Sequence, residues 1–473
     1  MASINKEIFF THLSRTREHW LENKDSQLYQ DADCLCFPMG TAGEDDSEAS
    51  VYTLSSSMHL FLSGWELGDT LLVLTPDKLF VLGSDKKCAL FEGILNEDGT
   101  TDENQFPIEI MRKDKKDGNN ENFNVLLSEM RSYGTKMGWF KKENFNGKFL
   151  SSFLMKSESL MFETVDISLG ISNMMVLKDA EERNTLKKAS VLTNKVMKHN
   201  LFSMIDSFIQ DEFPKKGNEE VTGSLISSKV EEVISDPRSI NNKVNPVNVD
   251  SCFTPFVDSG SQVDLKLSST PTENPLTKDV ISASMGIRYK SYCSYIARSF
   301  MVSPTKAVEE AYLSVIWLLE EFVKLLEEIG EDEKLTYADV TTKLREKLKE
   351  QSPHLLPYLT KSLGSSTGIE FKNSYHVFNS RCDSLISRDS CFVLMIGLEN
   401  VPLVTSTLKG EEEEEEEESK KTFSILVGDT VFWDGEGKVE LLTKLSKDFA
   451  HYSFFNDSES EGSDSDDDGV CRV

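Results

Sequence analysis

The sequence predicts a mixed α/β protein made of two large lobes. Its 473 residues exceed what a single hydrophobic core normally holds, so we expect two lobes and appendages. The first 175 residues alternate short strand and helix signals, whereas a long helical pattern begins after residue 178. We therefore expect an α/β lobe over residues 1–175, a second lobe over 176–450, and an acidic disordered tail or linker over 451–473.

Short apolar runs separated by turn residues mark the elements of the first lobe. The turn Pro76-Asp77 divides two β-rich runs, and Gly64 ends a short helical run. The expected elements are strands over 33–37, 51–54, 70–74 and 79–82 and a helix over 56–63. Strands and helices that alternate in this way predict a central sheet.

Amphipathic helical patterns mark the second lobe. The first covers residues 178–209, and a polar, loop-rich stretch surrounds a short helix over 225–234. Ser303 followed by Pro304 predicts the start of a further helix, because proline is favoured in the first helical turn. The pattern over 337–350 predicts another helix, and we expect both of these helices to pack on the core.

The chain is strongly acidic, with a net charge of −29. Eight glutamates fill residues 411–418 and seven acidic residues lie within 457–468, yet the remainder still carries about −14. Such a surface repels phosphate backbones and attracts basic partners. We therefore expect no direct nucleic-acid partner, while solubility alone stays an alternative explanation of the acidic runs.

The sequence lacks the patterns of a membrane span, a signal peptide, a cysteine metal site and several nucleotide-binding or catalytic motifs. No apolar run reaches the roughly 18 residues of a membrane span, and the first residues do not resemble a signal peptide. Cys34 and Cys36 lack a second pair at metal-binding spacing, and the motifs GxGxxG, GxxxxGK and CxxC are absent. We expect a soluble intracellular chain with reduced thiols, no membrane partner and no cofactor.

Residues 284–304, SMGIRYKSYCSYIARSFMVSP, combine hydrophobic order with a glycine and a charge pattern. This stretch resembles the metal-site hairpin of the pita-bread peptidases, the fold of methionine aminopeptidase, aminopeptidase P and prolidase. The resemblance implies a two-lobed, aminopeptidase P-like architecture with an α/β amino-terminal lobe and a pita-bread second lobe. The peptidase hairpin carries two aspartates that bind a pair of divalent metal ions, and this chain has Ser284 and Tyr295 at the matching positions.

The other metal-ligand positions of the peptidases differ too. The run LTKSLGSSTGIEF replaces a histidine-rich stretch, with Lys361 at its first histidine, and Leu267 replaces a histidine that contacts substrate. The five positions that correspond to ligands are Ser284, Tyr295, Ser365, Met395 and Gly428. Two hard divalent ions need several oxygen or imidazole donors. We therefore expect no bound metal, no catalytic residue and no aminopeptidase activity.

Longer phrases resemble one family in particular. SMHLFLSGWELGDTLLVLTPDKLFVLGSDKK, DISLGISNMMVLKD and LVGDTVFW are similar to the amino-terminal domain of the large subunits of FACT histone chaperones, a pita-bread domain without the peptidase ligands. The resemblance implies a non-catalytic histone-binding domain that acts in nucleosome disassembly and reassembly during transcription elongation, DNA replication and DNA repair. It also implies a location in the nucleus on chromosomes. The implied partners are core histones, replication and transcription factors, and the small FACT subunit through regions beyond this chain.

Loss of the ligands with retention of a concave fold suggests that the former catalytic cleft binds polypeptide without cutting it. The candidate residues of this peptide or histone cleft are Tyr289, Tyr292, Tyr295, Arg298 and Lys361. An equal alternative is that the aromatic rings fill the space left by the metals. Two other functions stay open, a diverged metal-dependent aminopeptidase and a peptide-binding scaffold unrelated to chromatin.

Overall fold

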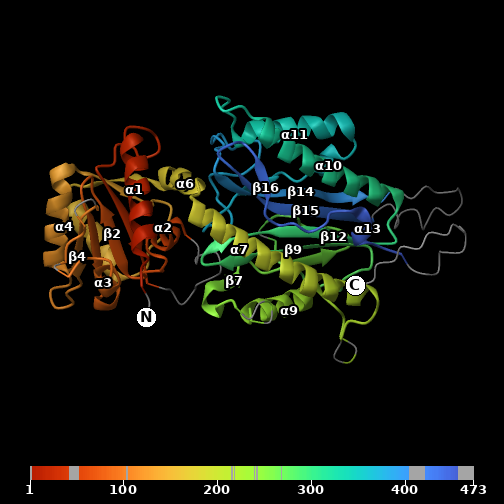
Figure 1. Cartoon of the computed structure of the whole chain (residues 1–473), viewed down its shortest axis with the longest axis horizontal. Coiled ribbons are helices and arrows are strands. Elements are labelled where there is room, and N and C mark those ends of the chain that lie inside the picture. Colours follow the sequence, from red (N-terminus) through yellow and green to blue (C-terminus); the bar gives the residue numbers. More distant parts are fainter. Residues whose placement is uncertain are drawn as a thin grey trace, which may run out of the picture.

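The computed structural model describes residues 3–41, 53–97, 99–102, 105–214, 217, 219–238, 240, 243–267, 269–403 and 421–455. Over these ranges the chain forms two lobes that lie side by side, and α7 runs from the first lobe along the second (Figure 1). The predicted mixed α/β fold is confirmed. In the described part of the chain, no helix has the length and apolar character needed to cross a membrane.

The amino-terminal lobe is built on a six-stranded sheet in the order β4-β3-β2-β1-β5-β6. Its strands are β1 (Cys34–Met39), β2 (Thr70–Leu74), β3 (Leu79–Gly83), β4 (Ile108–Arg112), β5 (Lys136–Trp139) and β6 (Glu163–Asp166). Successive residues of β1 alternate between two apolar clusters, with Leu35 and Phe37 in one and Cys34 and Cys36 in the other. Because side chains of a strand point to opposite faces, this sheet is buried on both.

Among the described residues, six helices accompany this sheet. They are α1 (Lys6–Glu22), α2 (Leu54–Ser63), α3 (Asp85–Glu92), α4 (Asn120–Tyr133), α5 (Lys148–Ser159) and α6 (Ser168–Val176). The Thr53 hydroxyl caps α2 by accepting from the N–H of Ser56, and Gly64 ends it at a φ of 74°. The expected strand over 51–54 is therefore wrong at its end, because Leu54 already begins α2. Residues 51 and 52 lie outside the described residues.

The second lobe contains an eight-stranded sheet whose main order is β13-β14-β15-β12-β9-β8. Its strands are β8 (Phe256–Ser259), β9 (Val280–Met285), β12 (Ile296–Val302), β13 (Gly364–Ser366), β14 (Ser390–Pro402), β15 (Thr422–Trp433), β16 (Val439–Leu441) and β17 (Ser453–Phe454). A smaller sheet joins β7 (Val249–Ser251), β10 (Ile287–Tyr289) and β11 (Tyr292–Cys293) in the order β11-β10-β7.

Helices lie on both sides of the second lobe as Figure 1 presents it, with α10 and α11 on one side and α7 and α9 on the other. They are α7 (Ala180–Val196), a π-helical turn (Met197–Leu201), α8 (Phe202–Ile209), α9 (Gly223–Ser235), α10 (Lys306–Glu328), α11 (Tyr337–Gln351) and α13 (Phe449–Tyr452), with 3-10 turns at Pro246–Asn248 and Leu356–Tyr358. The apolar stripe of α10 joins the main core, as its periodicity predicts.

Two expected boundaries of this lobe need correction. The helix expected from Ser303 and Pro304 begins only at Lys306, because Ser303 has a φ of 46° and the Thr305 hydroxyl caps the first turn. The tail expected from residue 451 is wrong at its start, since Tyr452 ends a helix and β17 pairs with β12. Residues 456–473 lie outside the described residues. The lobe division near 175 stays a prediction, with α6 ending at Val176 and α7 starting at Ala180.

Candidate functional site: the former metal site and the lobe junction

The five positions that correspond to peptidase metal ligands lie on β9, β13, β14, β15 and the residue before β12. Met395 of β14 pairs with Gly428 of β15, and Gly428 and Ser284 both pair with Ala297 of β12. All five residues are buried. Together they offer a phenol, two aliphatic hydroxyls and a thioether, which is no donor set for a hard divalent ion.

The ring of Tyr295 fills the centre of this former metal site. A Cβ atom on Gly428 would lie 2.7 Å from Cε1 of Tyr295, so glycine leaves the room that the ring takes. Phe253 and Phe371 stack on each other at 4.6 Å between ring centres and lie 5.9 and 6.0 Å from the Tyr295 ring. Burial raises the pKa of Tyr295, and a hydrogen bond with Ser284 opposes that shift.

Arg298 is a structural residue and not part of a cleft wall, which corrects the expectation for this position. Its guanidinium is fully buried, and Nη2 lies 3.0 Å from Oδ1 of the equally buried Asp429. Nη1 donates to the carbonyl oxygens of Ala297 (2.7 Å) and Gly428 (2.9 Å). Lys447 adds a second ion pair to Asp429 at 2.9 Å. The buried charges are therefore paired and hydrogen-bonded, as burial requires.

The remaining expected cleft residues lie apart from this core. Tyr289 is partly buried in β10, and Lys361 is exposed before β13. Tyr292 is buried, and its hydroxyl donates to Oε1 of Glu182 at 3.0 Å. The structure therefore corrects the expectation of one cleft formed by Tyr289, Tyr292, Tyr295, Arg298 and Lys361, because Tyr292, Tyr295 and Arg298 are buried and Lys361 alone is exposed.

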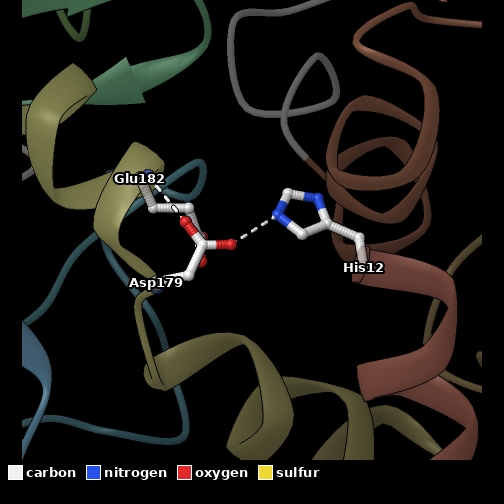
Figure 2. Close-up of side chains that lie close together, drawn as sticks. All are labelled: His12, Asp179 and Glu182. Carbon is white, nitrogen blue, oxygen red and sulfur yellow. Dashed lines mark hydrogen bonds and ion pairs between the residues drawn. The ribbon is translucent and has the colours of Figure 1, made fainter. Parts of the chain in front are cut away.

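Tyr292 belongs instead to a cluster between the lobes that the sequence reasoning missed. His12 on α1 faces Asp179 at the start of α7, with Nε2 and Oδ2 2.9 Å apart (Figure 2). Arg15 on α1 pairs with Oε2 of Glu182 at 2.8 Å. We call His12, Arg15, Asp179, Glu182 and Tyr292 the junction cluster, since it joins the amino-terminal lobe to the second lobe.

One part of the junction cluster was readable from the sequence. Asp179 and Glu182 form a capping box, in which the Asp179 carboxylate accepts from the N–H of Glu182 and Glu182 accepts from the N–H of Asp179. The pattern Asp-x-x-Glu before a helical run is the usual signal of such a start. The partners His12 and Arg15 carry no comparable signal, because they are 167 residues away from Asp179 and Glu182.

Three residues of the junction cluster are of types that can bind a metal ion, but they form ion pairs and hydrogen bonds with one another and with Arg15 and Tyr292. Atoms of His12, Asp179 and Glu182 lie within 4.8 Å of one another. Both oxygens of Glu182 already accept, one from Arg15 and one from Tyr292, and Arg15 also lies 3.8 Å from Asp179. The guanidinium thus supplies the positive charge that a metal ion would bring.

Protonation at the junction follows from these contacts. Nδ1 of His12 lies 2.5 Å from the carbonyl oxygen of Phe61, so it carries the proton of that bond. Partial burial opposes ionisation of Asp179, but hydrogen bonds from His12 and the Glu182 N–H, with the charge of Arg15, lower the pKa of Asp179 to about 2. The carboxylate therefore stays charged at neutral pH.

A deeper layer of the junction holds two further ionisable groups away from water. Lys178 is buried, and its ammonium donates to the carbonyl oxygens of Met175 and, at 2.8 Å, Val176, the last residues of α6. Burial lowers the pKa of Lys178. Burial and the nearby Glu143 raise the pKa of Glu370 to about 8, although Lys178 opposes that shift. Glu370 is therefore mostly protonated at neutral pH.

A cavity of about 530 Å³ lies beside the junction cluster. His12, Leu60 and Trp65 contribute from the amino-terminal lobe, and Glu182 and Tyr292 contribute from the second lobe. We call it the inter-lobe cavity. Its volume is in the range of pockets that bind small molecules or side chains of a peptide.

Comparisons with known proteins give two family models that match different parts of the chain. A model of the FACT complex subunit SPT16 N-terminal lobe domain matches residues 4–170, and a model of metallopeptidase family M24 matches residues 184–432. The FACT complex subunit SPT16 of Dictyostelium discoideum is 27% identical over 427 residues, which are 90% of this chain and 38% of that protein. The subunit of Arabidopsis thaliana is 28% identical over 471 residues, which are 97% of this chain and 41% of that protein. The chain thus spans about two fifths of the length of these relatives.

Solved structures give the same result. The N-terminal domain of FACT complex subunit SPT16 from Cicer arietinum is 25% identical with a TM-score of 0.81, over 96% of this chain and 100% of that one. The Eremothecium gossypii domain is 24% identical with a TM-score of 0.82 and the same coverage. A Xaa-Pro dipeptidase from Bacillus anthracis, 14% identical with a TM-score of 0.63, covers 96% of this chain and 100% of its own and shares the fold. The predicted peptidase-like architecture is confirmed.

Proposed function

Because the chain belongs to metallopeptidase family M24 and carries the amino-terminal lobe of the SPT16 family, we propose that it is a non-cleaving histone-binding module of a FACT-type histone chaperone. In this role it acts on nucleosomes as they are taken apart and rebuilt in transcription, replication and repair. Its proposed location is the nucleus, on chromosomes. Its proposed partners are core histones with replication and transcription factors, and the small FACT subunit binds through regions outside this chain.

The filled former metal site is the observation that carries the non-enzymatic part of this proposal. A peptidase of this fold needs two metal ions where Tyr295, Phe253 and Phe371 pack here. Leu267 and Met395 belong to the same apolar cluster, so the place of the peptidase ligands is hydrophobic. A diverged metal-dependent aminopeptidase would have to expel this cluster, which burial of its apolar surface opposes.

The charge of the chain supports a basic polypeptide as its partner. Core histones are rich in lysine and arginine, and the chain has a net charge of −29 with about half of it outside the two acidic blocks. Opposite charge accelerates encounter and favours such partners over neutral ones. A scaffold unrelated to chromatin would show no preference for histones over other basic proteins of similar charge.

Binding to core histones at two salt concentrations tests the proposal. The test compares the full chain with a variant in which the acidic residues of 411–418 and 457–468 are changed to glutamine or asparagine, which keeps chain length. Affinity that depends on these blocks alone falls steeply with added salt, because exposed charges are screened over roughly 8 Å at physiological ionic strength. We expect the neutralised variant to retain histone binding at moderate salt and lysozyme, a basic control protein, to bind weakly.

Two results would contradict the proposal. Complete loss of histone binding in the neutralised variant would assign recognition to the acidic blocks and not to the folded lobes. Two tightly held metal ions per chain, together with release of amino-terminal residues from peptides, would show that the chain is a peptidase.

A further inference from the structure

The rim of the inter-lobe cavity carries more carboxylates than cations. Glu66 follows α2, Glu181 lies on α7 and Asp250 lies in β7, and all three are exposed at the cavity. None of the three forms an ion pair with a lysine, arginine or histidine within the described residues. Lys290 is the exposed cation of the lining. The rim therefore carries a net negative charge.

Two charged side chains deeper in the cavity, Glu182 and Arg288, already form hydrogen bonds within the protein. Glu182 accepts from Arg15 and from Tyr292. Arg288 donates to the carbonyl oxygens of Ser291 (3.2 Å) and Ile369 (2.9 Å). An incoming ligand therefore meets the field of the rim carboxylates first, and that field selects cations.

Apolar surface lies beside these carboxylates. Trp65 is 37% exposed, and its Nε1 donates to the carbonyl oxygen of Ser3, which fixes the indole at the cavity edge. Val247, on the opposite lobe, is 85% exposed and also lines the cavity. Carboxylates next to an aromatic ring and an aliphatic side chain suit a lysine or arginine, whose long stem packs on apolar surface while its charged end pairs with oxygen.

We infer that the inter-lobe cavity binds a lysine or arginine side chain of an extended basic polypeptide. The side chain enters between Trp65 and Val247, and its charged group approaches Glu66, Glu181 and Asp250. Because both lobes contribute, binding holds them in one arrangement. The inference rests on the proposed function, since core histones are the basic polypeptides proposed above, and it assigns their recognition to the lobe junction instead of the former catalytic cleft.

Fluorescence anisotropy of the full chain with a labelled peptide tests the inference. The probe has the sequence of the histone H3 amino-terminal tail, and a peptide with glutamine at every lysine and arginine is its control. Salt at about 0.3 M suppresses long-range attraction by the acidic blocks. The cavity variant combines Glu66→Gln, Glu181→Gln and Asp250→Asn, and the matched control combines Glu320→Gln, Glu328→Gln and Glu346→Gln. The control residues are exposed on α10 and α11, on the side of the second lobe away from β7 (Figure 1).

We expect the cavity variant to lose about tenfold in affinity for the H3 peptide, and the control variant, with the same change in net charge, to lose less than about twofold. Equal losses in both variants, or no loss in either, would overturn the inference. Thermal unfolding of each variant shows whether it is folded before its affinity is compared.

A second measurement does not depend on any substitution in the protein. A photoreactive group next to a central lysine of the H3 peptide should cross-link the unaltered chain at residues 60–66 or 247–250, and cross-links confined to other segments would overturn the inference. If core histones bind but the cross-links lie elsewhere, the cavity assignment alone fails. If the unaltered chain binds neither histones nor the peptide, the proposed function fails with it.

Discussion

The former metal site and the inter-lobe cavity are opposite in character although both lie in the peptidase-like lobe or at its edge. The former metal site is packed with the rings of Tyr295, which is buried, and of Phe253 and Phe371, which are partly buried. The inter-lobe cavity has a volume of about 530 Å³ and carries exposed carboxylates, among them Glu181 and Asp250. Exposed carboxylates thus lie at the rim of the inter-lobe cavity, whereas aromatic rings fill the former metal site.

The contrast shows how a fold keeps its shape after losing a cofactor site. A cavity left by absent metal ligands would cost free energy in proportion to its volume, and large apolar side chains remove that cost. At the junction, by contrast, each buried charge keeps a partner, as Glu182 does with Arg15 and Tyr292. Substitutions in the former metal site should therefore change stability alone, whereas those at the rim of the inter-lobe cavity should change the binding of a basic polypeptide.

The largest effect is expected for Tyr295→Ala. It removes a ring that is 1% exposed and that touches both phenylalanines, so the free energy of unfolding should fall by about 4 kcal/mol. Urea unfolding followed by circular dichroism measures the change. Affinity for core histones should stay as in the unaltered chain wherever the variant is folded.

Tyr295→Phe is the matched control for that substitution. It keeps the ring and removes only the hydroxyl that bonds with Ser284, so a loss of about 1 kcal/mol is expected. A Tyr295→Ala variant that is as stable as the unaltered chain but binds histones more weakly would make the former metal site a recognition site and reverse the comparison.

A smaller effect is expected at the junction for Arg15→Met. The substitution keeps an apolar stem over the Phe61 ring, which the guanidinium covers at 4.5 Å, and removes the charge that pairs with Glu182. Because Glu182 is buried, its carboxylate then keeps only the Tyr292 hydroxyl as a donor from another part of the fold, and we expect a loss of about 2 kcal/mol. Hydrogen exchange at the start of α7 should become faster.

Arg381→Met provides the reference for the same change of side chain at the surface. Arg381 is exposed, and its substitution should alter the free energy of unfolding by less than about 0.5 kcal/mol. If the two variants are equally stable, the Arg15–Glu182 pair does not hold the lobes together, and the junction would be no more than a solvated contact.

Local patterns predicted most elements of the fold because their causes lie within a few residues. The strand expected over 70–74 matches β2 (Thr70–Leu74), and the helix expected over 337–350 matches α11 (Tyr337–Gln351) within one residue. The errors are local as well. Thr53 and Thr305 each cap a helix, and these caps, rather than the apolar pattern at 51–54 or Pro304, decide where α2 and α10 begin.

The candidate site was predicted only where residue identity alone settles the chemistry. The replacements at Ser284, Tyr295, Ser365, Met395 and Gly428 are visible in the sequence, but whether a ring faces a cleft or fills it depends on packing. Arg298 illustrates this limit, because its partner Asp429 is 131 residues away and the pair is fully buried. The junction cluster was missed for the same reason, since no local pattern links His12 to Asp179.

The smallest effect is expected for Glu370→Gln. It should depend on pH, whereas a substitution at the former metal site should not. Glu370 lies in the deep layer of the junction, where burial and Glu143 raise its pKa to about 8 from an ordinary value of 4.5. Between these two values the unfolded chain has released the proton and the folded chain still holds it, so this group lowers stability as pH rises from about 4.5 to about 8. Below that window both states are protonated, and above it both are ionised and the penalty is constant.

Glutamine keeps the shape of the protonated side chain and does not titrate, so Glu370→Gln should be more stable than the unaltered chain at pH 8 by on the order of 1 kcal/mol, with a smaller difference at about pH 5.5. An amide can still face the side chain of Asn373, which now donates to Glu370 at 3.2 Å. Urea unfolding at pH 5.5 and pH 8 measures the difference in the free energy of unfolding between each variant and the unaltered chain. For Tyr295→Phe, which alters no group that titrates between these pH values, this difference should be the same at both. A Glu370→Gln variant that is less stable at pH 8 than at pH 5.5, relative to the unaltered chain, would mean that Glu370 is ionised in the folded chain and stabilised by Lys178, and the junction would then depend on a buried ion pair at this position.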